Sequence, residues 1–467
     1  MAAPRGLPPG PRWPVTLQTL RYGLDPYGLF ESAHRTFGDV FTLHVMAETW
    51  VILAHPEAVR EVFGYGPDEL DSGSANLALR PLLGTRNVLL LDGAEHLRRR
   101  RIVLPPFHGE RMRAYEGLIR EATRREIATW PLGVPVPTLA RMHAITLWVV
   151  LRAVFGVEEG PGLDRLGTLL RRLLTWTTDP RRAVVFGFLG PDRLMALSAF
   201  RRQLAEVDDE ITAEIARRRK VGDLGDRKDI LSLLLQARDE DGGALLDHEL
   251  RDELITLLVA GHETTAAALS WALTEVAGDT EAQERLADGE QGLAEAAITE
   301  TLRLHPPVPL GGVRRLRRPM TVAGWQLPAG ATLAPCSLLV HRRPDVYTEP
   351  MAWRVDRFLR TRPPPGAWLP FGGGVRRCVG AAFAQFEAKT VLDELTRALE
   401  LRSAGRPSRR IGRRGIVIVP ARRGPVVAAR RQAPVPAATS AARRSHPTAA
   451  ATAGGPVGPN RRGPTPM

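Results

Sequence analysis

The sequence is poor in cysteine and contains no long hydrophobic run. Cys336 and Cys378 are the only cysteines among 467 residues, and they lie too far apart for a paired metal-binding or disulfide spacing. No run of about 18 uninterrupted apolar residues occurs, and the start of the chain is too short and too polar for a secretory or membrane leader. We therefore expect a protein without disulfides or a membrane anchor, located in the reducing cytoplasm.

Several nucleotide-binding and metal-binding motifs are also missing. No Gly-x-Gly-x-x-Gly lies between a strand and a helix, and no Lys-Ser or Lys-Thr pair follows a glycine-rich loop. A metalloprotease motif starting at His262-Glu263 would need histidine at position 266, where Ala266 stands. These absences exclude a built-in flavin or nicotinamide domain, a P-loop and a zincin site.

The positive charge is concentrated at one end of the chain. The net charge is +13, and residues 401–467 hold 14 arginines with no lysine or acidic residue, so 13 − 14 leaves −1 for residues 1–400. A nearly neutral body argues against nucleic-acid binding. Residues 432–467 are Ala, Pro, Thr, Gly and Arg without periodicity, which predicts a disordered basic tail after one domain at 1–431.

Hydrophobic periodicity predicts a mainly helical protein with small sheets, in the α+β class. Helices are predicted at residues 25–37, 246–278, 293–305 and 381–400. Strands are predicted as a hairpin of 40–45 with 50–54, a strand-rich stretch at 313–335, and a last hairpin of 416–419 with 426–427.

One cysteine lies where a metal-binding thiolate is expected. Cys378 follows a glycine-rich loop, stands beside arginine and directly precedes the helix predicted at 381–400. Nearby arginine and the amides of a helix N-terminus lower the pKa of a thiol. The glycines allow the backbone to approach a flat group, and Arg376 can donate two hydrogen bonds to a carboxylate. Haem has both features, and the alternative is a glycine turn with a buried free thiol.

The loop resembles the cysteine loop of the cytochrome P-450 family, Phe-x-x-Gly-x-Arg-x-Cys-x-Gly. The fixed positions are filled by Phe371, Gly374, Arg376, Cys378 and Gly380. The resemblance covers about residues 7–431 and implies the family's fold, with a long central helix over the haem and the cysteine loop below it. It also implies that Cys378 is the axial ligand of haem b and that Arg376 binds a haem propionate.

A second motif, Ala260-Gly261-His262-Glu263-Thr264, lies in the middle of the long apolar helix. Glycine and threonine are unfavourable there, so a functional reason is expected. The resemblance implies that this segment forms an oxygen-binding groove, in which Thr264 hydrogen-bonds dioxygen and Glu263 relays protons for O–O cleavage. By itself the motif also suits a polar pair that faces another helix.

Further charged residues are predicted to bind haem or to stiffen its surroundings. His96 and Arg100 lie about 40° apart on one helix wheel, so both can reach one target. The resemblance implies that they bind haem propionates together with Arg314, whose choice over Arg315 depends on the strand register. It also implies a structural ion network, formed by the following three residues: Glu300, Arg303 and Arg357.

The resemblance implies a soluble, monomeric haem-thiolate monooxygenase. Such an enzyme inserts one atom of O2 into a C–H bond by hydroxylation or epoxidation. Electrons must come from a ferredoxin or flavodoxin with its NAD(P)H reductase, and a basic patch of Arg98, Arg101 and Arg377 is predicted to dock an acidic redox protein.

The substrate is predicted to be an apolar small molecule such as a fatty acid or a terpenoid. The segments implied to line the pocket, 72–91, 173–196, 257–264 and 308–313, are mostly aliphatic. Two alternatives remain at this point, a peroxide-dependent haem-thiolate oxidase and a non-catalytic haem-binding sensor. The Glu263-Thr264 pair disfavours both.

Overall fold

The described part of the chain falls within residues 1–431, which form one unit. The computed structural model describes residues 6–46, 48–109, 111–156, 161–178, 197–220, 224–225, 227–405, 411–421 and 424–431. The predicted tail at 432–467 lies outside the described residues, as does part of the predicted pocket segment 173–196.

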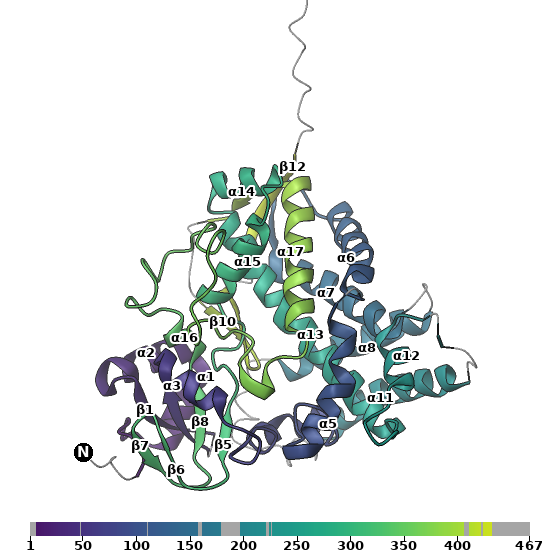
Figure 1. Cartoon of the computed structure of the whole chain (residues 1–467). Coiled ribbons are helices and arrows are strands. Elements are labelled where there is room, and N and C mark those ends of the chain that lie inside the picture. Colours follow the sequence, from purple (N-terminus) through teal and green to yellow (C-terminus); the bar gives the residue numbers. More distant parts are fainter. Residues whose placement is uncertain are drawn as a thin grey trace, which may run out of the picture. The chain divides into compact units, whose positions relative to one another are not determined.

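Helices make up most of the described structure (Figure 1). The α-helices are α1 (Val15–Leu24), α2 (Pro26–Phe37), α3 (Pro56–Gly64), α4 (Arg80–Leu83), α5 (Gly93–Val103), α6 (Arg111–Ala128), α7 (Thr138–Phe155), α8 (Pro161–Thr177), α11 (Ser198–Arg219), α12 (Ile230–Gln236), α13 (Asp247–Val276), α14 (Thr280–Ala287), α15 (Leu293–Leu304), α16 (Ser337–Val340) and α17 (Ala381–Ala398). Short 3-10 helices are η1 (Ser74–Leu79), η2 (Pro105–Phe107) and η3 (Gly374–Arg376).

The strands form small sheets. They are β1 (Val40–Val45), β2 (Glu48–Leu53), β3 (Leu70–Asp71), β4 (Pro135–Pro137), β5 (Arg314–Leu316), β6 (Met320–Val322), β7 (Trp325–Leu327), β8 (Thr332–Pro335), β9 (Leu399–Ser403), β10 (Ile411–Arg414), β11 (Val417–Pro420) and β12 (Pro425–Arg430). The largest sheet has the order β1-β2-β8-β5-β3, and in Figure 1 its strands lie beside α1, α2 and α3. The predicted fold class, mainly helical with small sheets, is confirmed.

The first predicted hairpin is correct and the last one is wrong. β1 and β2 pair antiparallel, with Val40 opposite Leu53. β11, however, pairs with β10, and β12 pairs with β9 and β4. The arginine-rich β10 lacks the apolar pattern of a strand, so its pairing was not visible in the sequence. The turn between β10 and β11 contains Gly415 at φ +57°, a conformation that favours glycine.

The long helix α13 runs through the main hydrophobic core. Its buried residues include Leu254, Ile255, Leu258 and Leu269, which pack in one cluster with apolar residues of α6, α7, α11 and α17. Because α13 is apolar on almost every side, it is covered by protein around most of its length. Because most of α13 is buried, an accessible position on this helix marks a place where a ligand could contact it.

One described helix has the length and composition to cross a bilayer. It is α7, in which 67% of the apolar stretch is buried inside the protein. Core helices of globular proteins have the same properties.

A buried ion network connects α15 with the segment that follows α16. Glu300 and Arg303 have fully buried side chains, and Arg303 Nε and Nη2 donate to the Glu300 carboxylate at 2.7 and 2.8 Å. Arg357 Nε donates to Glu300 Oε1 at 2.9 Å. Arg303 Nη1 also donates to the carbonyl oxygens of His341 and Pro350. One carboxylate therefore holds two guanidinium groups and orders a long loop.

We expect Glu300→Gln to lower the free energy of unfolding by about 3–5 kcal/mol, because Arg303 would remain buried without its counter-charge. The measurement is urea unfolding of the wild-type and variant proteins. Glu57→Gln is the control, since Glu57 forms an exposed pair with Arg60 and its loss should cost less than about 1 kcal/mol. Equal effects of the two substitutions would contradict a stabilising role for the network.

Candidate active site

Cys378 lies in a loop between η3 and α17. Its backbone N–H donates to the Phe371 carbonyl oxygen at 2.9 Å, which closes the loop, and the Ala381 N–H donates to the Cys378 carbonyl oxygen at 3.4 Å. Cys378 is exposed, whereas the other cysteine, Cys336, is fully buried. The loop thus presents one sulfur atom to an open space.

Cys378 is accessible, yet surrounding protein atoms desolvate its thiol. Burial among surrounding protein atoms raises the pKa of the Cys378 thiol, although the Gly380 N–H, Arg100 and Arg377 act to lower it. The sequence-based expectation of a lowered thiol pKa is therefore wrong for the free side chain. A bound metal ion would itself deprotonate the thiol.

The glycines of the loop permit close contacts with other parts of the protein. Gly374 has φ +61°, and a Cβ atom there would lie 2.4 Å from the Phe63 carbonyl oxygen. A Cβ atom on Gly373 would lie 2.2 Å from the Phe63 ring, and one on Gly372 would lie 2.5 Å from the Gly311 carbonyl oxygen. The expectation that these glycines make room for a flat ligand is thus corrected at these positions, where the room is taken by protein. Gly380 meets nothing within 4 Å.

A pocket beside the loop gathers cationic groups from three distant segments. His96 of α5, Arg314 of β5 and Arg376 of η3 line it, together with Asp92. Arg100, one turn after His96, contributes to the lowered pKa of His96. The structure therefore brings together these four predicted propionate-binding residues.

Asp92 organises this pocket, and the sequence analysis did not identify it as a site residue. Its carboxylate accepts hydrogen bonds from the N–H groups of Ser72 and Gly73, both at 2.7 Å, and of Ser74 at 2.9 Å. Burial acts to raise the pKa of Asp92, but these bonds and the charge of Arg376 lower it below its usual range. The position of Asp92 directly before the predicted helix was the available signal.

Arg376 is already engaged by the protein. Its Nη2 contacts Asp92 Oδ1 at 2.5 Å and the Leu91 carbonyl oxygen, and Nη1 donates to the Val88 carbonyl oxygen at 2.9 Å. Arg376 therefore ties the cysteine loop to the segment that precedes α5, and its charge faces the same pocket as His96.

His96 and Arg100 have donors to spare. Neither side chain forms a hydrogen bond or ion pair with another residue in the part of the chain that the structure describes. His96 is 2% exposed, and burial followed by the charges of Arg376 and Arg100 lowers its pKa to about 3. Burial also lowers the pKa of Arg100. These two side chains therefore have donors available for a bound carboxylate.

The structure distinguishes Arg314 from Arg315. Arg314 is 6% exposed, lines the pocket and donates to the Gly373 carbonyl oxygen at 3.2 Å. Burial followed by the charge of Arg376 lowers its pKa to about 10. Arg315 instead forms an ion pair with Glu48 at 2.8 Å. Adjacent residues of β5 point to opposite faces, so only Arg314 reaches the pocket.

The middle of α13 has a short accessible stripe in an otherwise buried helix. Ala260 is exposed, and Gly261 and Thr264 are partly accessible. The Thr264 hydroxyl donates to the Ala260 carbonyl oxygen at 2.7 Å, which satisfies that carbonyl group beside the opening. A Cβ atom on Gly261 would contact Val150 at 3.5 Å, an ordinary packing distance. The stripe is small and almost apolar.

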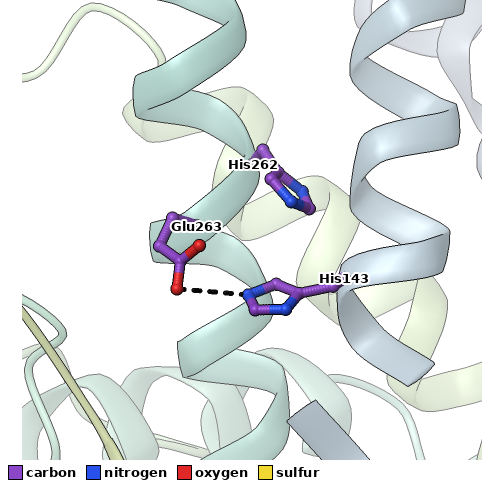
Figure 2. Close-up of side chains that lie close together, drawn as sticks. All are labelled: His143, His262 and Glu263. Carbon is purple, nitrogen blue, oxygen red and sulfur yellow. Dashed lines mark ion pairs between the residues drawn. The ribbon is translucent and has the colours of Figure 1, made fainter. Parts of the chain in front are cut away.

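Glu263 faces away from the solvent and belongs to another polar cluster (Figure 2). Arg414 Nε of β10 donates to Glu263 Oε1 at 2.6 Å, and His143 Nε2 of α7 lies 3.3 Å from the same oxygen. Burial acts to raise the pKa of Glu263, but His143 and Arg414 lower it to about 2. The adjacent His262 is buried, which lowers its pKa to about 3, and its Nδ1 lies 2.8 Å from the Thr146 hydroxyl.

The polar contacts define two groups of residues. Cys378 interacts electrostatically with Arg100, and through it with the cationic pocket. Glu263 has its closest polar contacts with His143 and Arg414, which sequence reasoning missed. No local pattern marks these two residues, because their role depends on packing between segments that are far apart in the chain.

Comparisons with known proteins agree on one family. The sequence model of the cytochrome P450 family matches residues 7–423. Cytochrome P450 135A1 of Mycobacterium tuberculosis is 38% identical over 408 residues, which cover 86% of this chain and 90% of that protein. Cytochrome P450 135B1 of Mycobacterium bovis is 39% identical over 434 residues, with 89% and 90% covered.

Solved structures support the same fold. Retinoic acid bound cyanobacterial CYP120A1 matches with a TM-score of 0.80 at 22% identity, covering 92% of this chain and 100% of that chain. The cytochrome P450DA heme domain matches with a TM-score of 0.76 at 23% identity, covering 92% and 99%. The match over nearly all of the described unit, with the cysteine loop in place, shows that the chain belongs to the cytochrome P450 family of haem-thiolate monooxygenases.

Proposed function

We propose that this cytochrome P450 uses haem b and O2 to hydroxylate or epoxidise an apolar small molecule such as a fatty acid or terpenoid. The observation that carries the proposal is one accessible cysteine, Cys378, whose thiol is desolvated and lies near Arg100, a donor without a hydrogen-bond partner among the described residues. We place the enzyme in the cytoplasm as a monomer.

The residues of the cavity fit haem. Cys378 would supply the axial thiolate, and His96 and Arg100 would donate to the propionates, with Arg314 and Arg376 adding positive charge at the same edge. Bound haem supplies the dioxygen chemistry of the family, and an axial thiolate favours O–O cleavage. The protein's own contribution is to hold the thiolate, orient the group and exclude water.

Thr264 and Glu263 are the residues we assign to proton transfer. Thr264 lies on the accessible stripe of α13, where its hydroxyl oxygen can accept a hydrogen bond while its hydrogen is donated to Ala260. Glu263 is ionised because of its low pKa, and its Oε2 is buried without a hydrogen-bond partner among the described residues. Oε2 is therefore the atom we expect to receive and pass on a proton.

The substrate class follows from the accessible stripe. Ala260 and Gly261 carry no polar side-chain atoms, and the partly accessible Leu257 continues the apolar surface one turn earlier. Thr264 is the polar exception, and its hydrogen is already donated within the helix. A guest at this surface would lose hydration without finding polar partners, so apolar molecules are favoured.

Electrons would come from an acidic ferredoxin or flavodoxin with its NAD(P)H reductase, since the family generally depends on such partners. Arg377 is exposed beside Cys378 and is the residue we assign to docking. Arg98 and Arg101 are already paired, with Asp239 and Glu240. These acidic partners reduce the net positive charge of the predicted basic patch.

We expect Thr264→Ala to lower the product formed per reducing equivalent by about tenfold or more, because the hydroxyl at the opening is lost. The measurement is product against NAD(P)H consumed, with haem content checked. Thr274→Ala is the matched control, since Thr274 makes the same bond to the carbonyl oxygen four residues earlier, at 2.8 Å to Ser270. A similar loss in both variants would assign the effect to the helix and contradict the proposal.

The substrate class is tested by titrating the ferric protein with fatty acids and terpenes and recording the spin-state change of the haem spectrum. We expect saturable shifts with apolar guests and none with sugars of similar size, because the stripe offers no polar partners. If no fatty acid or terpene produces a shift, the assigned substrate class is wrong.

A further inference from the structure

A second cluster of ligand-type side chains lies between α7 and α13. His143 of α7 and His262 and Glu263 of α13 each offer one ligand atom, and these atoms all lie within 4.8 Å of one another. Figure 2 shows the two imidazole rings and the carboxylate directed into the space between the two helices. The ring centroids of the two histidines are 4.8 Å apart. The cluster contains no cysteine and shares no residue with the proposed thiolate site.

Two atoms of this cluster are buried without a hydrogen-bond partner. They are Nε2 of His143 and Oε2 of Glu263, both unpartnered among the residues that the structure describes. His143 Nε2 approaches Glu263 Oε1 at 3.3 Å without the alignment of a hydrogen bond. Burying such groups unsatisfied costs roughly 1–3 kcal/mol each. An additional ligand would remove this cost.

Other atoms of the cluster are hydrogen-bonded to neighbouring residues. In a metal site, such residues in the outer shell orient the ligands in the same way. The Thr146 hydroxyl lies 2.8 Å from Nδ1 of His262, so Nε2 of that ring is the nitrogen left for a ligand. Arg414 occupies Oε1 of Glu263 and leaves Oε2 free. Hydrogen bonds of this kind fix the orientation of ligating imidazoles and carboxylates.

We propose that His143, His262 and Glu263 bind one divalent zinc-class ion, with the fourth position open. Two imidazoles and one carboxylate form a known ligand set for zinc and a poor one for magnesium or calcium, which prefer oxygen ligands. Zinc bonds of about 2.0–2.1 Å place tetrahedral ligand atoms about 3.4 Å apart. The most widely separated ligand atoms, up to 4.8 Å apart, must therefore approach each other by up to about 1.4 Å.

A zinc ion at this position would inhibit the enzyme. This consequence rests on the proposed function of Glu263. An ion on Oε2 would occupy the atom assigned to proton transfer. We therefore expect zinc to lower product formation per reducing equivalent without changing the haem spectrum. The binding itself is independent of this role.

The test uses the haem-containing protein, treated with a chelator, then equilibrated with a small excess of zinc and freed of unbound metal. Elemental analysis should find one zinc per chain in addition to the haem iron. His143→Ala, His262→Ala and Glu263→Gln should each lose that zinc while they retain haem. His248→Ala, which removes an exposed histidine from the same helix, should retain it.

Two further measurements sharpen the result. X-ray absorption at the zinc edge should show nitrogen and oxygen ligands, and a sulfur ligand would assign the metal to a cysteine and overturn the proposal. Arg414→Gln should bind zinc several-fold more weakly, because the hydrogen bond that orients the Glu263 carboxylate is lost, and unchanged binding would contradict this role of Arg414.

The proposal is overturned if the wild type retains no zinc, or if the three cluster variants retain as much as His248→Ala. Either result leaves the haem site untouched, since the spectrum of the thiolate-bound haem reports on Cys378 alone. Conversely, a failed haem assignment would not remove the zinc stoichiometry. The two conclusions are therefore separable.

Discussion

The structure depends on keeping the Cys378 thiol accessible while surrounding protein atoms desolvate it. Burial raises the pKa of the Cys378 thiol, so the protein alone does not produce a thiolate there. The loop is nevertheless fixed by the hydrogen bond from Cys378 to Phe371 and by close packing of its glycines on Phe63. The loop thus fixes the position of Cys378, and a coordinated metal ion would supply the deprotonation of its thiol.

The charged residues near the cysteine loop connect that loop with other parts of the fold. Asp92 binds three backbone amides before α4 and also contacts Arg376, so it connects the cysteine loop with the segment that enters α5. His96 and Arg100 lie on the same side and have no side-chain hydrogen bond to any residue that the structure describes. On α13, the polar residues are divided between the accessible stripe, where Thr264 lies, and the α7 side, where Glu263 contacts His143. One helix therefore serves two polar sites with adjacent residues.

The sequence predicted what depends on local pattern. The extents of α2, α13, α15 and α17, the hairpin of β1 and β2 and the cysteine loop all follow from periodicity, turn residues and short spacings. The pairing of β11 with β10, the role of Asp92 and the partners of Glu263 depend on contacts between distant segments. The loop glycines show the same limit, since their conformation was predictable but the groups they approach were not.

The central claim is that Cys378 is the axial ligand of haem, and the most direct test is the spectrum of the reduced protein with carbon monoxide. Thiolate ligation predicts a Soret band at about 450 nm in the wild type, and histidine ligation one at about 420 nm. We expect Cys336→Ala to keep the wild-type band and Cys378→Ser to lose it. A wild-type band at the histidine position, or an unchanged band in Cys378→Ser, would contradict the account.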